Sequence, residues 1–383
     1  MKTNKMCAIL GNVSKFNGLL PLTDHRPLDT LPFDCKYRLL DFPLSSIVNA
    51  NINNIFMVFN EGETQSVFDH IGGGKEWNLD SLQNRYFIYF YQEFLKKKAE
   101  GLPYFTPVID YLQKSKSDYT VFMGSKMLCN IDLRAVLKIH QAQKNELTVV
   151  YKRMDTKKIY SSDAVLDLDP DGNIAGYHFF EEHDLALEKT NLCMDIFIVE
   201  TKWLIEQLKE GQKIGSPASI QDFLRMRIGE VTTSAYEYTG YLSNIYDIQS
   251  YYKANMDMLD SAKFNSLMYS SKKIYTKLKN EVPTYYAECS QVKNSQCATG
   301  CIIEGTIENS LISRRSVVKK EAKINHSIVM ANAKIGEKAL IEYAILDKNV
   351  VVNAGVTIKG TPEKPVVVKK NEVVSKDLIG GNN

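Results

Sequence analysis

The sequence lacks the features of membrane, secreted and nucleic-acid-binding proteins. Its 383 residues contain no apolar run near the roughly 18 residues that cross a bilayer. The first residues, Met1–Cys7, lack the apolar core of a signal peptide. Forty-seven basic and 45 acidic residues leave a net charge of only +2, which provides no basic footprint for nucleic acid or an anionic membrane. We therefore expect a cytoplasmic protein without nucleic-acid or membrane partners.

Cysteine and histidine are too scattered to predict a metal site. Seven cysteines are present, and Cys289, Cys297 and Cys301 have seven and then three residues between them. That is not a zinc-ribbon spacing, and no histidine lies nearby in the sequence. The six histidines show no metal-binding spacing either. We interpret the cysteines as reduced, small apolar residues and predict no metal ligands.

What the first two thirds of the chain does contain is an alternation of strand and helix patterns. Buried strands separated by amphipathic helices indicate a mostly parallel, doubly wound α/β sheet. The predicted strands are Met6–Leu10, Asn54–Phe59, 118–123, 147–152 and 192–199, with a β-pair at Ala164–Leu168 and Ile174–Phe179. The predicted helices are 106–114, Leu133–Gln143, 202–208, 219–226 and 248–259.

After about residue 285 a sequence repeat replaces the helical periodicity. Ile307, Ile324 and Ile341 begin similar segments at a step of 17 residues, and Val318, Ile335 and Val352 form a second column. A fixed period with apolar columns indicates a solenoid, here with three short strands per coil and about four coils. His326 lies in one column with Asn309 and Tyr343, which predicts a solvent-facing or stacking position rather than a catalytic base.

These patterns predict two domains. The expected boundaries are an α/β domain at 1–260, a linker at 261–285 and a parallel β-helix at 286–383.

Three segments resemble the bacterial glucose-1-phosphate adenylyltransferases (ADP-glucose pyrophosphorylases). They are Pro21-Leu22-Thr23, Lys36-Tyr37-Arg38-Leu39-Leu40-Asp41-Phe42-Pro43-Leu44-Ser45 and Tyr251-Tyr252-Lys253-Ala254-Asn255-Met256-Asp257. The resemblance covers nearly the whole chain. It implies a nucleotidyltransferase domain, Rossmann-like, followed by a left-handed parallel β-helix. It also implies the reaction of ATP with glucose 1-phosphate to give ADP-glucose and pyrophosphate, for glycogen synthesis.

The residues that would carry this chemistry are replaced. In the loop after the first strand, the glycine spacing of the family is lost over Asn12–Gly18 and Phe16 enters the loop. The resemblance assigns five degenerate positions: Gly18 for an arginine, Leu28 for a lysine, Ser125 and Asn244 for the two metal-binding aspartates, and His183 for the sugar-phosphate lysine. Phosphoryl chemistry needs carboxylates for Mg²⁺ and cations for the leaving pyrophosphate, so we predict no catalytic residues and no tightly bound cofactor. Magnesium is expected only if some catalysis remains.

A chain that keeps the framework and loses the reacting groups resembles the D-type regulatory subunits of this family. That resemblance implies activation of a catalytic C-type partner in a heterotetramer or another homo- or hetero-oligomer. Two alternatives stay open: a weakly active adenylyltransferase and a stand-alone sensor of sugar nucleotides or effectors. The retained cations Arg26, Lys36 and Arg38 are candidates for an effector or anion site, or for ion pairs that hold the fold.

Overall fold

The computed structural model describes residues 5–11, 13–62, 64–81, 84–269 and 272–380, which form two compact units. One unit comprises Met1–Lys15, Leu40–Asn244 and Leu267–Tyr275, and the other comprises Phe16–Leu39, Ile245–Ser266 and Thr276–Asn383. The second unit therefore combines the N-terminal loop region, one helical segment and the C-terminal repeats.

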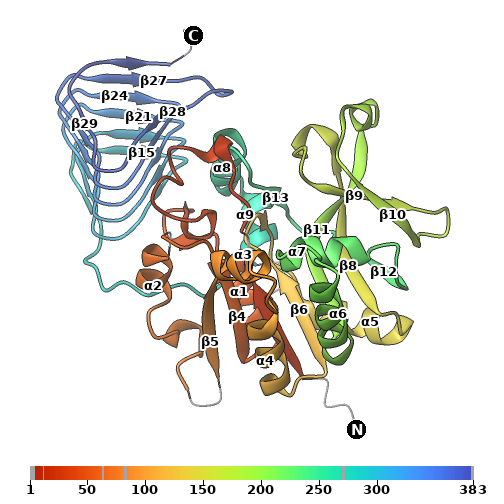
Figure 1. Ribbon diagram of the computed structural model, residues 1–383. Helices are drawn as coiled ribbons and strands as arrows, with labels where there is room; N and C mark the ends of the chain where they lie inside the picture. Colours follow the sequence, from red (N-terminus) through yellow and green to blue (C-terminus); the bar gives the residue numbers. More distant parts are fainter. Residues whose placement is uncertain (1–4, 12, 63, 82–83, 270–271, 381–383) are drawn as a thin grey trace. The chain divides into compact units, whose positions relative to one another are not determined.

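The first unit is built on a nine-stranded mixed sheet (Figure 1). Its central path runs β10-β9-β11-β6-β1-β4-β5, with β8 beside β11 and β12 beside β8. Strands β1, β4, β5 and β6 are parallel, whereas β11 runs antiparallel to β6, β8 and β9. The strands are β1 Met6–Leu10, β4 Asn54–Phe59, β5 Arg85–Phe90, β6 Tyr119–Met123, β8 Leu147–Asp155, β9 Ala164–Leu168, β10 Ile174–Phe179, β11 Lys189–Glu200 and β12 Thr233–Glu237.

Helices pack on both faces of this sheet because alternate strand side chains point to opposite sides. In β1, Met6, Ala8 and Leu10 join one apolar core with α1, α2 and α5, whereas Cys7 and Ile9 join a second core with α3, α4, α6 and α7. The helices are α1 Asp41–Asn49, α2 Gln65–Ile71, α3 Tyr91–Ala99, α4 Thr106–Ser115, α5 Leu133–Gln143, α6 Thr201–Lys213 and α7 Ile220–Arg227.

Two short strands form a separate two-stranded sheet after the carboxyl end of β6. Strand β7 (Met127–Leu128) follows β6 after a three-residue gap, Gly124-Ser125-Lys126. It pairs antiparallel with β13 (Ser243–Asn244). This pairing brings Asn244 next to the carboxyl end of β6.

The second unit contains a parallel β-helix whose strands stack in three sheets (Figure 1). Apolar side chains of successive coils form a continuous core, including Ile307, Ile324 and Ile341. The three sheets have the following strands: β14 Tyr285–Tyr286, β17 Ile302–Ile303, β20 Val317–Val318, β23 Lys334–Ile335, β26 Val351–Val352 and β29 Val373–Val374; β15 Gln291–Lys293, β18 Thr306–Glu308, β21 Lys323–Asn325, β24 Leu340–Glu342, β27 Thr357–Lys359 and β30 Leu378–Ile379; β16 Gln296–Cys297, β19 Leu311–Ile312, β22 Ile328–Val329, β25 Ala344–Leu346 and β28 Val366–Val368.

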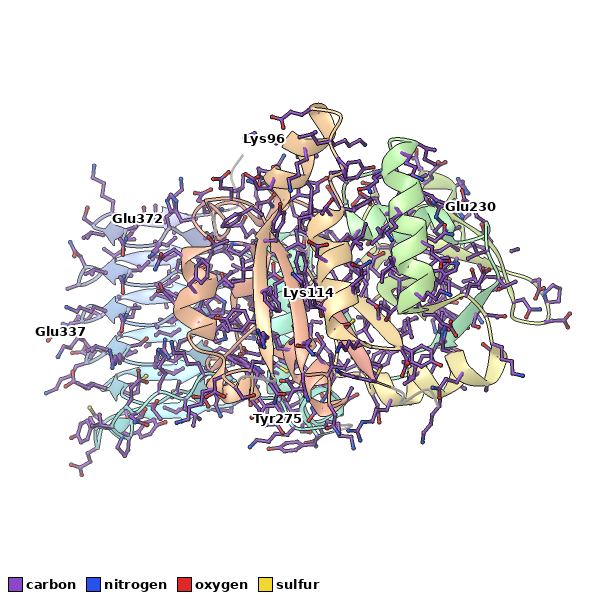
Figure 2. The ribbon with its side chains drawn as sticks, turned by 60° about the horizontal axis from the view of Figure 1, so that its bottom comes forward. Lys96, Lys114, Glu230, Tyr275, Glu337 and Glu372 are labelled. Carbon is purple, nitrogen blue, oxygen red and sulfur yellow. The ribbon has the colours of Figure 1, made fainter. Side chains whose placement is uncertain are left out.

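The solenoid has more coils than the four expected from the repeat, since two of its sheets contain six strands and the third contains five. The coil that begins at Val292 is recognisable in the sequence as a rough copy, although its step is 15 residues, from Asn294 to Asn309. The C-terminal coil escaped detection because its step is 22 residues, from Asn349 to Asn371. Figure 2 shows Glu337 and Glu372 projecting away from the coils.

Side chains also connect the coils outside the apolar core. The hydroxyl of Ser310 accepts from the backbone N–H of Ser327, and the hydroxyl of Ser327 accepts from that of Ala344, each a 17-residue step. The stacking position predicted for His326 is confirmed, because its ring lies 4.9 Å from that of Tyr343 at 17°.

The expected linker 261–285 begins instead with a helix, α9 (Ser261–Met268). Within the first unit, residues 267–269 and 272–275 pack against the α/β core: Asn130 donates to the carbonyls of Leu267 and Lys272, and Tyr275 donates its N–H to the hydroxyl of Ser45. In the second unit, α8 (Ile248–Met256) and the hairpin β2 (Pro32–Phe33) and β3 (Tyr37–Arg38) lie with the coils.

Candidate functional site

The carboxyl ends of β1, β4 and β6 are where a doubly wound fold places its ligand. Gly11 follows β1 there, and a Cβ at this position would lie 2.5 Å from the carbonyl oxygen of Val58, so only glycine fits. The cavity between Gly11, Val13, Val58 and Phe122 measures about 20 Å³, which is space for about one water. Asn12, the next residue of the loop, lies outside the described residues.

Beside the carboxyl end of β6, a buried lysine forms an ion pair. The Nζ of Lys126 contacts Oδ1 of Asp163, and the two side chains are 7% and 0% exposed. The other carboxylate oxygen of Asp163 accepts from Nδ2 of Asn244 at 2.6 Å and from the backbone N–H of Tyr160 at 2.9 Å. Lys126, Asp163 and Asn244 thus form a closed polar cluster, which we call the Lys126 cluster.

This cluster explains how the fold tolerates the two positions that the sequence analysis assigned to lost metal ligands. Ser125, buried next to Lys126, and Asn244 are both neutral, and Asn244 donates to the only carboxylate in the cluster. That carboxylate, Asp163, is already neutralised by the ammonium of Lys126. Magnesium prefers several carboxylate or water oxygens in an octahedral arrangement, so the donor set does not fit this ion.

The Lys126 cluster was missed by reasoning from the sequence, because Asp163 is 37 positions from Lys126 and Asn244 is 81 positions from Asp163. One signal was available: Lys126 directly follows Ser125, at the carboxyl end of a correctly predicted strand.

The remaining degenerate positions, Gly18, Leu28 and His183, differ in their surroundings. In the second unit, a Cβ on Gly18 would lie 2.8 Å from Cβ of Asp247, so an arginine does not fit there without movement. Leu28 and Phe16 are buried. In the first unit, His183 is 68% exposed, and its Nδ1 lies 3.4 Å from Oε2 of Glu181.

A group of cations lies together within the second unit. Arg26 is buried, donates to the carbonyl of Leu22 at 2.8 Å and forms an ion pair with Asp347. Burial, with Arg38 and Arg26 nearby, lowers the pKa of Lys348 to about 7 from an ordinary value of 10.5. Arg314 contributes to the same lowering.

Lys279 belongs to the same group. Burial lowers its pKa, and the charges of Arg314, Lys277 and Arg38 lower it further. Two carboxylates lie among these cations: Asp347 forms an ion pair with Arg26, and Oε1 of Glu281 lies 3.5 Å from Nε of Arg314. We call Arg26, Arg38, Lys279, Arg314 and Lys348 the basic cluster.

Of the three cations predicted for an anion site, the structure brings Arg26 and Arg38 together in the basic cluster. Lys36 is exposed and its ammonium lies 5.4 Å from the ring centre of Tyr37. Arg26 pairs with Asp347 rather than with an acid near it in the sequence. Lys348 and Lys279 were missed because they lie more than 250 positions along the chain from Arg26.

In the turn between β2 and β3, a buried carboxyl has an unusual pKa. Burial raises the pKa of Asp34 to about 7, although Gln296 and Lys36 act against this rise. Its Oδ1 has no hydrogen-bond partner among the described residues. Asp34 adopts a left-handed backbone conformation with φ of 47°.

Comparison of the sequence with known proteins shows the family of this chain. A nucleotidyl transferase family model matches residues 17–261, and a model of the GlmU-like C-terminal hexapeptide region matches residues 282–375. The chain is 30% identical to the glycogen biosynthesis protein GlgD of Bacillus subtilis over 97% of this chain and 98% of the relative. It is 31% identical to the protein of the same name from Geobacillus stearothermophilus, with 97% of each covered.

A glucose-1-phosphate adenylyltransferase of Bacillus cereus is 26% identical, over 94% of this chain and 96% of the relative. Among the described residues, no helix is long and apolar enough to cross a membrane.

Proposed function

This chain belongs to the nucleotidyl transferase family and ends in a left-handed parallel β-helix of the hexapeptide type, and we propose that it is a non-catalytic regulatory subunit in glycogen biosynthesis. In this proposal it binds a catalytic C-type glucose-1-phosphate adenylyltransferase subunit and raises that subunit's activity. The names of the similar GlgD proteins support the pathway.

The observation that carries the proposal is the Lys126 cluster. An adenylyltransferase of this kind needs a divalent metal to offset the charge of the reacting phosphates. Here the internal ammonium of Lys126 neutralises Asp163, and Asn244 donates to that same carboxylate instead of offering a charged oxygen. Losing a metal clamp corresponds to several kcal/mol of transition-state stabilisation, or roughly a 10³-fold lower rate.

The experiment measures ADP-glucose formation from ATP, glucose 1-phosphate and Mg²⁺ by the purified chain alone, by the catalytic subunit alone and by their mixture. The proposal expects no turnover by the chain alone and a higher rate, or a changed effector response, in the mixture. Size-exclusion chromatography of the mixture should then yield a complex that contains both chains.

The weakly active enzyme is the competing function, and it is distinguished by the same assay. If the chain alone makes ADP-glucose and if Ser125→Ala or Asn244→Ala abolishes that activity, the regulatory proposal is wrong. A stand-alone sensor would instead bind ATP, ADP-glucose or a sugar phosphate tightly in calorimetry without any effect on the catalytic subunit.

The basic cluster favours a regulatory anion site as part of this function. Cations held close together gain stability when a phosphate binds among them. We propose that Arg26, Arg38 and Lys348 bind a phosphorylated effector, with Lys36 at the exposed edge of the hairpin. Because Lys348 has a pKa near 7, phosphate binding should be accompanied by proton uptake at pH 7.5.

Proton uptake is measured by calorimetry with glucose 1-phosphate in two buffers of different ionisation enthalpy. The observed enthalpy should differ between buffers for the wild type and should not for Lys348→Met. Equal enthalpies for the wild type in both buffers would contradict a role for Lys348 in the site.

A further inference from the structure

The end of the β9–β10 hairpin carries a cluster of two histidines and an aspartate that the regulatory function proposed above does not use. His178 lies on β10, and His183 and Asp184 lie in the short 3₁₀ helix Glu182–Ala186 that follows. One ligand atom from each of the three residues lies within 4.8 Å of the other two. All three belong to the first compact unit.

Both imidazoles approach the same carboxylate. Nε2 of His178 lies 3.1 Å from Oδ1 of Asp184, and Nε2 of His183 lies 3.8 Å from that oxygen. The two rings are stacked, with centroids 5.8 Å apart and planes at 25°. Ligand atoms around a four-coordinate zinc ion lie roughly 3.3 Å apart when each bond is about 2.0–2.1 Å, so small side-chain rotations bring these three atoms to that separation.

The other nitrogen of each imidazole faces a further carboxylate. Nδ1 of His178 lies 3.1 Å from Oδ1 of Asp167, and Nδ1 of His183 lies 3.4 Å from Oε2 of Glu181. Metal-bound histidines in proteins characteristically donate their second N–H to a carboxylate, which fixes the tautomer and makes the ligating nitrogen more basic. This arrangement of two histidines around one shared aspartate is therefore typical of a metal site rather than of a group of exposed carboxylates.

Asp184 is held in place for a ligand role by the local backbone. Its Oδ2 accepts the N–H of Glu181 at 2.9 Å in a capping box, and its side chain is only 4% exposed. Its Oδ1 faces the two histidines. By contrast, the His183 side chain is 68% exposed, which leaves room for water to complete a coordination shell.

We propose that His178, His183 and Asp184 bind one divalent transition-metal ion of the zinc class, with Asp167 and Glu181 as outer carboxylates. Imidazole nitrogens select zinc and its neighbours over hard cations such as magnesium, which prefer oxygen ligands. The ion would tie the end of β10 to the 3₁₀ helix beyond it. This inference does not depend on the regulatory role, because the cluster shares no residue with the Lys126 cluster or the basic cluster.

The test is calorimetric titration of the full chain with ZnCl₂ at pH 7.5. A Cys289→Ser background removes the exposed thiol as a competing ligand. We expect one zinc ion per chain, and no displacement by excess Mg²⁺. His183→Gln and His178→Gln should each weaken binding more than 100-fold, whereas Asp167→Asn should weaken it about 10-fold because it removes only an outer partner.

Two further variants keep the result interpretable. His25→Gln alters an exposed histidine that is not a member of the cluster and should bind zinc like the background protein. His183→Lys keeps a basic side chain but offers no imidazole, and it should lose the site. Circular dichroism of each metal-free variant checks that the fold is retained.

Any one of three results overturns the proposal. The first is that the background protein does not bind zinc stoichiometrically below about 100 µM, a concentration corresponding to roughly −5.5 kcal/mol of binding free energy. The second is that the double variant His178→Gln/His183→Gln binds zinc as tightly as the background. A Co²⁺ spectrum with a thiolate charge-transfer band would likewise assign the ion to the cysteines and refute the site.

Discussion

Replacing Lys126 by methionine tests whether its ammonium takes the place of a metal ion in the first unit. Methionine keeps most of the length and apolar surface of the side chain but removes the charge. Asp163 would then be left with two donors, the backbone N–H of Tyr160 and the amide of Asn244, and with no counter-charge. Since both side chains of the ion pair are at least nine-tenths buried, the loss should follow the behaviour of buried pairs.

Removing one partner of a buried ion pair costs about 3–5 kcal/mol, because an uncompensated charge stays in the interior. We expect Lys126→Met to lower the free energy of unfolding of the first unit by that amount. The double variant Lys126→Met/Asp163→Asn should recover most of the loss, because asparagine can still accept from Tyr160 and Asn244 without carrying a charge. Lys138→Met, on an exposed position of α5, is the matched control and should change stability by less than about 0.5 kcal/mol.

The assay is urea denaturation followed by tryptophan fluorescence. The chain has two tryptophans, Trp77 and Trp203, and both belong to the first unit. Fluorescence therefore reports the unit that contains the ion pair, even if the two units unfold separately. A loss below about 1 kcal/mol for Lys126→Met would refute the reasoning, as would a double variant no more stable than the single one. Either outcome would mean that the ammonium is not the counter-charge of Asp163.

Three further predictions concern the second unit. Burial raises the pKa of Asp34 from 3.8 to about 7, so between these pH values the folded state holds a proton that the unfolded state has lost. The free energy of unfolding should therefore fall as pH rises from 4 to 7, by at most about 1.4 kcal/mol per pH unit. Asp34→Asn should remove this slope in thermal melts. The lowered pKa of Lys348 has the opposite effect on stability, since the unfolded state holds the proton between pH 7 and 10.5 and the folded state does not. The free energy of unfolding should therefore rise with pH in this range. Lys348→Met should flatten the rise in the same melts. Gly305→Ala would place a Cβ 2.4 Å from the carbonyl oxygen of Ala322 and should destabilise the coils by about 1–3 kcal/mol, measured by circular dichroism. The control is Gly355→Asn, because a Cβ there meets no atom within 4 Å and asparagine tolerates the positive φ.

Much of the fold follows from local patterns. Strands β1 and β4 and helix α5 begin and end at the predicted residues, because each is a periodic apolar segment bounded by clear turn signals. The inner coils of the solenoid were predicted for a similar reason, since each copy supplies the same columns at a step of 17 residues. The C-terminal coil was missed because its step changes to 22 residues.

The candidate sites were less accessible to sequence reasoning. A replaced residue such as Asn244 can be identified by position in a motif, but its new partner cannot. Asp163 and Lys348 are ordinary charged residues in the sequence, and only the chain's path brings them to Asn244 and Arg26, respectively. The histidine cluster was missed for a related reason: His178 and His183 do not match a familiar metal-binding spacing, yet the turn after β10 points both rings at Asp184.

The serine hydroxyls that connect successive coils have a consequence for how this part of the protein can change over time. Ser310 bonds to Ser327, and Ser327 bonds to Ala344, by the same geometry and at the same 17-residue interval. If the 17 residues of one such coil were deleted, the hydroxyl of Ser310 would accept from the backbone N–H of Ala344, as it now accepts from that of Ser327. The apolar columns of the remaining coils would still align. The height of the solenoid is therefore free to vary by whole coils, and a coil of another length keeps the columns when the difference in length falls between strands, as in the 15-residue and 22-residue steps.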